Sequence, residues 1–172
     1  MYAMKIKTPL LCLLISFMFC ATSCPDDLLY VQLVDIELYN LDFSGEKMTE
    51  SSEPIKKEAY VIGIKYLVKH DYEGFGDKTW YYHPDKEYGN SEIITNIKRN
   101  PTVLTLSDFN EDYPAGSDIS HLFTYGRSDY YEEMSLLLVL NAVPDPGIHS
   151  FKVKLPTENN LIIEEIIETT LY

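Results

Sequence analysis

The fold of this chain is decided by one stretch, Ala59-Tyr60-Val61-Ile62-Gly63-Ile64-Lys65-Tyr66-Leu67-Val68-Lys69-His70. Its even-numbered side chains from Tyr60 to Val68 are all aliphatic or aromatic, while its two lysines stand at odd positions. A period of two is typical of a β-strand that buries one face and exposes the other. We therefore expect a strand here, with its even-numbered side chains in a core.

The same alternation recurs in other parts of the chain. In Tyr30 to Leu38 we expect one buried face, formed by Tyr30, Val34, Ile36 and Leu38. His149 to Leu155 alternates in the same way. Two shorter strands are expected at Ile93 to Lys98 and Thr102 to Leu106, separated by Pro101, which cannot donate a hydrogen bond within a sheet.

Two segments leave alternatives open. Met134 to Leu140 is apolar on both faces, as expected of a central strand covered from two sides or of a buried helical turn. Leu161 to Tyr172 fits either a strand or a helical stripe of isoleucines, and its β-branched content favours the strand. About seven short strands without a sustained helical pattern predict an all-β fold, an immunoglobulin-like antiparallel β-sandwich with long loops.

The first residues have the three parts of a secretory signal peptide. Two lysines precede the apolar stretch Leu10 to Phe19, which is too short to span a bilayer core of ~30 Å. Ala21 and Ser23 are the small residues that a signal peptidase needs before Cys24. We expect cleavage before Cys24 and lipidation of that cysteine, whose acyl chains would anchor the protein to a membrane. The alternative is an ordinary secretory signal with a cysteine there by chance.

The cysteines and the length of the chain suggest that it is divided into three parts. Removal of residues 1–23 as the signal peptide takes away Cys12 and Cys20, so that Cys24 has no partner for an intramolecular disulfide. Residues 24–29 would form an acidic tether. Residues 30–172 would form one domain, since a chain of this length is an ordinary size for a single core.

The chain is strongly acidic, with a formal net charge of −13. Such a field repels the phosphates of nucleic acids, so no nucleic-acid partner is expected. Cations, basic peptides and neutral sugars remain open as ligands. The alternative is that the acidity only keeps an exported domain soluble.

No motif in the sequence indicates catalysis or a metal. The four histidines are scattered without a His-Glu-x-x-His pair, and no serine stands in a nucleophile elbow. Asp108 to Asp112 opens like a calcium loop, but Tyr113 stands where the loop needs glycine and Ile119 where it needs a bidentate glutamate. We expect no enzyme activity, no metal and no cofactor.

The aromatic stretch between Asp71 and Asn90 is where we expect a ligand to bind. Its candidate residues are Tyr72, Trp80, Tyr81, Tyr82 and Tyr88. Rings on a loop or edge strand can stack on sugars or hold a peptide, with a large contact area at low entropic cost. The alternative is that Trp80 and one tyrosine close the end of the sandwich.

Pro25, Asp26 and Asp27 follow Cys24 directly. This arrangement resembles the export signal that sends lipoproteins of Bacteroidetes to the outer face of the outer membrane. Residues 54–64 and 115–120 resemble stretches of uncharacterised small Bacteroides lipoproteins. The resemblance implies a location, the outer membrane with the chain exposed at the cell surface, and no activity.

Taken together, these features predict a non-enzymatic, lipid-anchored protein of the cell surface. It would act as an accessory binding or adhesion module, with a glycan or a peptide as its ligand. The alternative is a structural or protein-interaction lipoprotein of the envelope that faces the periplasm.

Overall fold

The computed structural model describes residues 28–70, 78–84, 92–98, 100–126 and 134–172. Two single 3₁₀ turns, η1 (Lys57–Ala59) and η2 (Ser120–Leu122), are the helical elements of these ranges. No helix in them is long and apolar enough to cross a membrane. The strands are β1 (Leu28–Asp42), β2 (Thr49–Glu50), β3 (Tyr60–His70), β4 (Thr79–Tyr82), β5 (Glu92–Thr95), β6 (Thr102–Thr105), β7 (Phe123–Gly126), β8 (Leu136–Leu140), β9 (Gly147–Pro156) and β10 (Ile162–Leu171).

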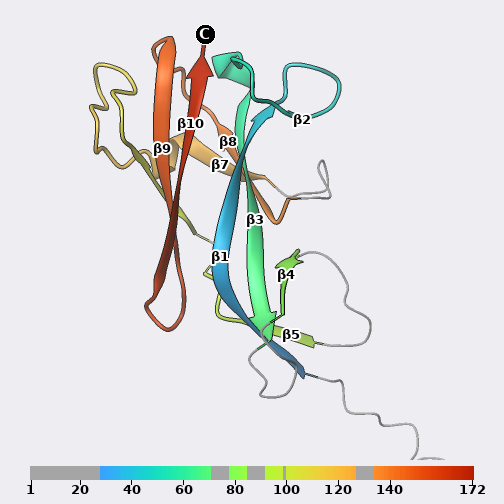
Figure 1. The fold of residues 1–172 in the computed structure, drawn as a ribbon. Coiled ribbons are helices and arrows are strands. Elements are labelled where there is room, and N and C mark those ends of the chain that lie inside the picture. The colour runs from blue at the N-terminus through green and yellow to red at the C-terminus, as the bar shows by residue number, and fades with distance from the viewer. Residues whose placement is uncertain (1–27, 71–77, 85–91, 99, 127–133) are drawn as a thin grey trace, which may run out of the picture.

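The strands form two sheets, which lie side by side in Figure 1. The long strands β1 and β3 are the antiparallel centre of the larger sheet. On the free edge of β1, β2 pairs at one end and β5, in parallel, at the other. On the free edge of β3, β8 and β4 pair one after the other, and β7 lies beyond β8. The smaller sheet has the order β10-β9-β6. The predicted all-β antiparallel sandwich is confirmed.

The main core lies between the two sheets. The even-numbered side chains of β3 from Tyr60 to Val68 are all buried in it, as the sequence predicted. They face Phe151, Val153 and Leu155 of β9, which are fully buried. Each large apolar side chain that is removed from water in this way contributes about 1.5–3 kcal/mol. The alternation in β3 and β9 therefore determines which faces of the two sheets pack against each other.

A second apolar cluster covers part of the outer face of the larger sheet. We call it the outer cluster, and its buried members are Leu41, Met48, Val61, Met134 and Leu137. It packs closely on Gly63, where an added Cβ would lie 2.8 Å from a methyl group of Leu41 and 2.9 Å from the sulfur of Met134. Because β8 carries Leu137 into this cluster and Leu138 into the main core, the predicted central strand is confirmed and the helical alternative is excluded.

The predicted buried face of β1 is wrong for its first half. Tyr30 is 44% exposed, whereas Val31 and Leu33 are buried. The register with β3 shifts between Leu33 and Asp35, so Val34 is the extra residue of a β-bulge. A bulge moves the following side chains to the other face of the sheet. Ile36 is therefore buried as predicted, while the residues before the bulge follow the opposite alternation.

The remaining predicted strands are confirmed in type. β5 and β6 lie in different sheets, so the chain crosses the sandwich between them, where Pro101 lies. β9 and β10 form a hairpin over their whole lengths, which settles the ambiguity of the last segment in favour of a strand. Its turn includes Asn160 at a φ of 62°, in the left-handed region that asparagine tolerates well.

Candidate functional site

Four side chains meet on the outer face of the larger sheet, beside the outer cluster. Beyond the bulge, the odd-numbered Glu37 and Tyr39 of β1 point to this face. Lys65 of β3 lies directly opposite Glu37 in the register, and Tyr81 of β4 pairs with the next outward residue of β3, Leu67. We call the group of Glu37, Tyr39, Lys65 and Tyr81 the tyrosine–glutamate face.

Glu37 is the centre of this group. The hydroxyl of Tyr39 donates a hydrogen bond to Oε2 of Glu37 at 2.5 Å, and the hydroxyl of Tyr81 donates to Oε1 at 2.8 Å. The Nζ of Lys65 lies 4.4 Å from the ring centroid of Tyr39 and 5.7 Å from that of Tyr81. A cation at these distances is attracted by both rings. Three strands thus contribute to one hydrogen-bonded and cationic cluster.

The hydrogen bonds and charges within the tyrosine–glutamate face favour one protonation state of Glu37 and of the two tyrosines. The hydrogen bond from Tyr39, then that from Tyr81, lowers the pKa of Glu37, and the charge of Lys65 acts in the same direction. The same hydrogen bonds to Glu37 raise the pKa of Tyr39 and of Tyr81. At neutral pH the face therefore presents a carboxylate, two neutral phenols and an ammonium group.

The two tyrosines differ in exposure. Tyr39 packs against the outer cluster and is partly buried, whereas Tyr81 is 52% exposed. Tyr39 therefore anchors the group to the sheet, and Tyr81 offers its ring to solvent. The arrangement is suited to hold a ligand by stacking and by hydrogen bonds. It is poorly suited to transfer a proton, because both phenols stabilise the ionised form of Glu37.

Among the residues predicted to bind a ligand, the structure separates Tyr81 from its neighbours. Trp80 lies on the opposite face of β4, where its ring is 4.2 Å from that of His70 and packs against the main core. Tyr82 is buried in that core. The positions of Trp80 and Tyr82 agree with the alternative, in which such rings close the sandwich. Tyr72 and Tyr88 lie outside the described residues, as do Cys24, Pro25, Asp26 and Asp27.

The sequence did not single out Glu37, Tyr39 and Lys65 as site residues. Alternation alone placed Glu37 and Tyr39 on the outward side of their strand, and Lys65 on the outward side of another. The missing information was the pairing of β1, β3 and β4, which brings residues 37, 65 and 81 together. An outward carboxylate between apolar neighbours was the available signal.

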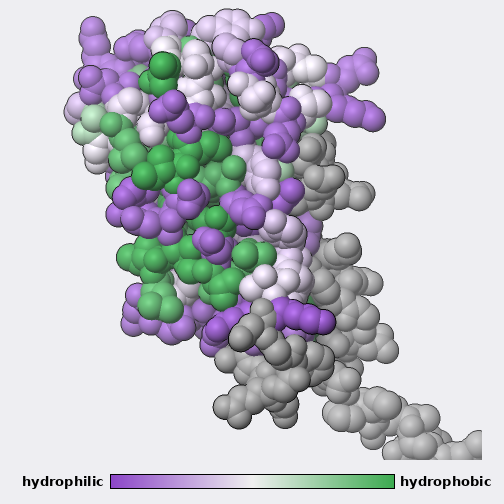
Figure 2. All heavy atoms as spheres, viewed as in Figure 1, coloured by the Kyte–Doolittle hydropathy of each residue, from purple (hydrophilic) through white to green (hydrophobic). Residues whose placement is uncertain are grey.

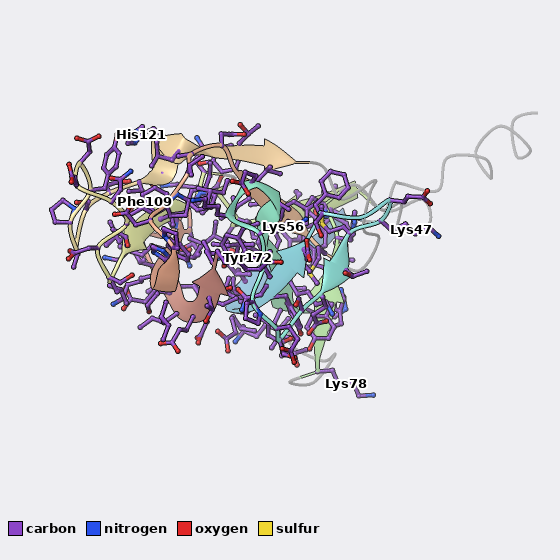
Figure 3. The ribbon with its side chains drawn as sticks, turned by 90° about the horizontal axis from the view of Figure 1, so that it is seen from above. Lys47, Lys56, Lys78, Phe109, His121 and Tyr172 are labelled. Atoms are coloured by element: carbon purple, nitrogen blue, oxygen red, sulfur yellow. The ribbon has the colours of Figure 1, made fainter. Side chains whose placement is uncertain are left out.

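The segment that opens like a calcium loop uses its oxygens to shape a turn. Oδ1 of Asp108 accepts a hydrogen bond from the amide of Ala115 at 2.9 Å, and Oδ1 of Asn110 accepts from the amides of Asp112 and Tyr113. Figure 3 shows this end of the molecule, where Phe109 and His121 are labelled. Within the described ranges no three potential metal ligands gather.

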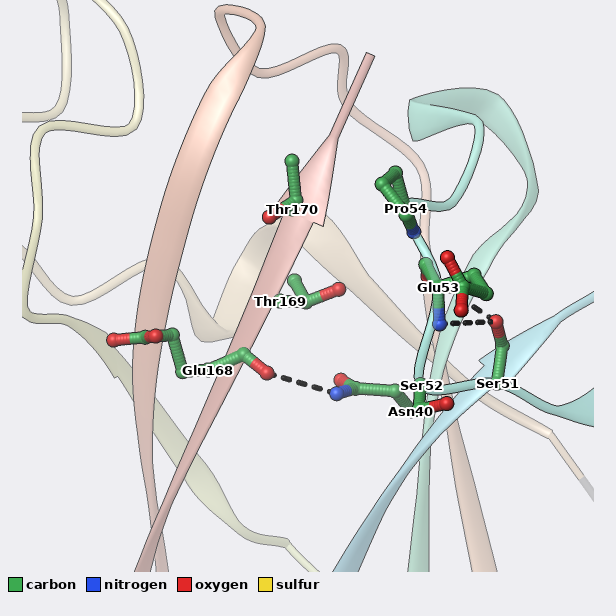
Figure 4. A pocket seen from close by; sticks show the side chains of 8 residues that line it. All are labelled: Asn40, Ser51, Ser52, Glu53, Pro54, Glu168, Thr169 and Thr170. Atoms are coloured by element: carbon green, nitrogen blue, oxygen red, sulfur yellow. Dashed lines mark hydrogen bonds between the residues drawn. The ribbon is translucent and has the colours of Figure 1, made fainter.

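A small pocket lies between residues 51–54 and β10 (Figure 4), with a volume of about 190 Å³. Asn40 closes it on one side by donating a hydrogen bond to the carbonyl of Glu168 at 2.8 Å. Its walls also carry hydroxyls and carboxylates, but no aromatic side chain lines it. The lining residues are Asn40, Ser51, Ser52, Glu53, Pro54, Glu168, Thr169 and Thr170. The tyrosine–glutamate face is therefore the stronger candidate.

Comparison with known proteins gives a family without a known activity. Residues 33–142 match a family described as a domain of unknown function, DUF5034. The matched range includes all four residues of the tyrosine–glutamate face and ends before β9. None of the curated proteins and none of the solved structures matches the chain. Because the match covers more than half of its length, the chain belongs to the DUF5034 family.

Proposed function

We propose that this chain is a lipid-anchored accessory binding protein of the cell surface, and that its tyrosine–glutamate face binds a glycan. One observation carries the proposal. The exposed ring of Tyr81 is held in place by a hydrogen bond to a carboxylate, with an ammonium group 5.7 Å from its centroid. This is a stacking surface with hydrogen-bonding groups beside it.

The chemistry of a sugar ring is complementary to these groups. Its C–H face is apolar and packs on an aromatic ring, while its hydroxyls donate to a carboxylate and accept from an ammonium group. The hydrogen bond to Glu37 fixes the ring of Tyr81 before any ligand arrives, which lowers the entropic cost of binding. A peptide could stack on the same ring, but the charged groups and hydroxyls beside the ring favour a ligand with many hydroxyl groups.

The charge of the chain narrows the class of glycan. Glu37 is ionised and the whole chain carries a formal net charge of −13. Sugars that carry carboxylates or sulfates would be repelled at long range. We therefore propose a neutral glycan or one with amino groups.

The same electrostatics support binding in preference to catalysis. A general acid in glycoside hydrolysis needs a carboxyl group with a raised pKa, and a second carboxyl group across the scissile bond. The pKa of Glu37 is lowered by the hydroxyls of Tyr39 and Tyr81 and by the charge of Lys65, so Glu37 lacks the raised pKa of a general acid. A non-enzymatic role fits this environment.

The location in this proposal rests on the sequence. The signal peptide, Cys24 and the following Pro25-Asp26-Asp27 support an acylated protein at the outer face of the outer membrane, as in small lipoproteins of Bacteroidetes. Membership of a family without an assigned activity is compatible with that origin. Replacement of Cys24 by alanine should release the protein from the membrane fraction. Retention of the Cys24→Ala variant would contradict the anchor.

A glycan array with the purified chain tests the proposed ligand. The Tyr81→Ala variant should lose binding by about tenfold or more, equivalent to about 1.4 kcal/mol. Tyr125→Ala is the matched control, since Tyr125 is similarly exposed at 43% but lies on β7. The proposal fails if no glycan binds, or if both variants bind as the unchanged chain does.

A second candidate function is a structural lipoprotein that faces the periplasm and binds another protein. Exposed isoleucines on the smaller sheet favour it, because Ile148, Ile162 and Ile166 are each more than half exposed. Figure 2 shows hydrophobic residues over this sheet. Protease added to intact cells distinguishes the two, since it should degrade a surface protein and spare a periplasmic one.

A further inference from the structure

Strand β10 is an edge strand over most of its length. It pairs with β9 on one side, along its whole length. On the other side, among the described residues, its backbone pairs only with the segment at Ile55, next to Leu171, while β1 packs beside it and the side chain of Asn40 contacts the carbonyl of Glu168. Figure 1 shows β10 at the margin of the smaller sheet, and Figure 3 shows Lys56 and Tyr172 together at the end where this contact is made.

The existing contacts reveal which backbone groups point to this edge. The amide of Ile55 donates to the carbonyl of Thr170 at 2.9 Å, and the amide of Tyr172 donates to the carbonyl of Ile55 at 3.2 Å. The side chain of Asn40 donates to the carbonyl of Glu168. The groups that point away from β9 thus belong to even-numbered residues. Because alternate residues of a strand face the same edge, Ile162, Glu164 and Ile166 continue this row.

We propose that the edge from Ile162 to Ile166 pairs with an extended segment of a partner protein in which apolar residues alternate with lysine or arginine. Such strand addition gains affinity from backbone hydrogen bonds and specificity from alternate side chains. The chain's own Ile55 segment already adds to the same edge, which shows that the edge accepts an additional strand. This inference does not depend on the tyrosine–glutamate face, which lies on the other sheet.

The apolar residues of the proposed partner strand are inferred from the outer face of β10. Ile162 is 61% exposed and Ile166 is 51% exposed on this face, with Glu164 between them. Glu164 is bound by Lys152 at 3.0 Å and by Lys154 at 3.9 Å, so its charge is already compensated. A partner strand gains most here by placing apolar side chains beside the two isoleucines.

The lysine or arginine residues of the partner strand are inferred from the opposite face of β10. Glu165 lies on the side of β10 that faces the sandwich, yet it is exposed. Within the described residues, Glu165 forms no ion pair. A lysine or arginine at the alternate positions of a partner strand would meet this carboxylate, and the net charge of −13 would attract such a strand at long range.

A second copy of this chain fits the edge poorly. An antiparallel pair of β10 strands would bring Glu164, Glu165 and Glu168 of one copy close to the same acidic residues of the other. Like charges opposite each other across a strand pair are destabilising. The acidic residues of β10 thus select against self-association and in favour of a basic partner.

Titration of the full-length chain with a defined peptide tests the proposal. The probe is a peptide of about ten residues that alternates valine and lysine, an ordinary strand length. A matched peptide carries the same side chains but N-methyl groups on the amides of one edge. We expect the first peptide to bind, with increased hydrogen-exchange protection at residues 162–166, and the second to bind at least tenfold more weakly. Equal binding of both peptides would overturn the proposal, because charge alone would then explain it.

Variants of the chain locate the binding edge. Ile166→Pro removes an amide that points away from β9, so the hairpin is retained while the edge is blocked. The double variant Ile162→Lys and Ile166→Lys keeps the backbone and should weaken binding by repulsion. Ile148→Thr, on the same outer face of β9, is the control and should bind as the unchanged chain does. Binding that both edge variants retain would overturn the proposal, as would a dimer that dissociates on Ile166→Pro.

Discussion

The buried phenol of Tyr60 donates a hydrogen bond to Oδ1 of Asn40 at 2.8 Å. Through its Nδ2, Asn40 donates in turn to the carbonyl of Glu168 on β10. One amide therefore connects a ring of the main core with the edge of the smaller sheet. Burial raises the pKa of Tyr60, so its hydroxyl is a permanent donor in this connection.

Removing either end of this connection should lower stability. Tyr60→Phe should reduce the free energy of unfolding by about 1 kcal/mol, the usual net contribution of one hydrogen bond. Asn40→Ala should reduce it by about 1–3 kcal/mol, because it leaves the hydroxyl of a fully buried tyrosine unpaired. Urea unfolding measures both. Tyr30→Phe, at an exposed tyrosine, should change little, and an equal loss there would contradict the prediction.

Among the serines that the structure describes, Ser135 should be the most sensitive to substitution. Its buried hydroxyl accepts a hydrogen bond from the amide of Tyr66 at 2.9 Å and donates to the carbonyl of Tyr82. It thus satisfies backbone groups at the point where β4 and β8 meet along β3. Ser135→Ala should cost about 1–3 kcal/mol by leaving these groups unpaired. The exposed Ser44→Ala should have no measurable effect on the urea midpoint, and similar midpoints for both variants would refute this role.

The contribution of Glu37 should depend on pH. Because hydrogen bonds lower its pKa in the folded chain, its stabilisation is present above the unfolded value of about 4.3 and is lost as the pH falls through the folded value. The melting temperature of the unchanged chain should exceed that of Glu37→Gln at neutral pH. The difference should shrink when the pH falls below about 4. A difference that stays constant from neutral to acidic pH would disprove the assignment.

Tyr81 offers a way to separate stacking from hydrogen bonding. Tyr81→Phe keeps the ring but loses the hydrogen bond to Glu37, so it should retain more glycan affinity than Tyr81→Ala does. Trp80 is the only tryptophan and directly precedes Tyr81, so its fluorescence can report binding. A saturable change in emission on glycan addition is expected. Equal losses in both variants would show that the ring itself does not contribute.

Gly63 should not tolerate a branched side chain. A Cβ at this position would already meet Leu41 and Met134 at less than 3 Å. Gly63→Val should therefore displace the outer cluster from the sheet and cost about 1–3 kcal/mol. Gly45→Ala is the control, since its nearest neighbour would be 3.8 Å away, and it should lie within about 0.5 kcal/mol of the unchanged chain. A stable Gly63→Val variant would mean that the cluster readily repacks.

Alternation predicted strands where a single face is buried and the register is regular. It was successful for β3 and β9, whose inward side chains occupy the main core. It was wrong for Tyr30 and Val34, because the bulge at Val34 shifts the phase and no residue pattern marks a bulge. Short strands such as β4 and β7 have too few residues for a period to be recognised.

The candidate site was only partly predictable for a related reason. An aromatic stretch pointed to Tyr81, but the same stretch also contained Trp80 and Tyr82, which the alternation of β4 sends to the core. Glu37 and Lys65 are distant in sequence and meet only because β1 and β3 pair in this register. A local sequence pattern predicts which side chains share a face of one strand. A site on a sheet can be predicted only when the order and register of several strands are known.

The early start of β1 has a consequence for how high the domain would stand above a membrane. β1 begins at Leu28 and is held there by its parallel pairing with β5. If Cys24 carries the acyl chains, the residues between it and Leu28 can span at most ~14 Å, at about 3.5 Å per residue. The C-terminus lies at the opposite end of the sandwich from the start of β1 (Figure 1). With so short a connection to the lipid, the domain would stand upright, with β4 and β5 near the lipid headgroups. Only ligands that reach the level of the headgroups would then contact Tyr81.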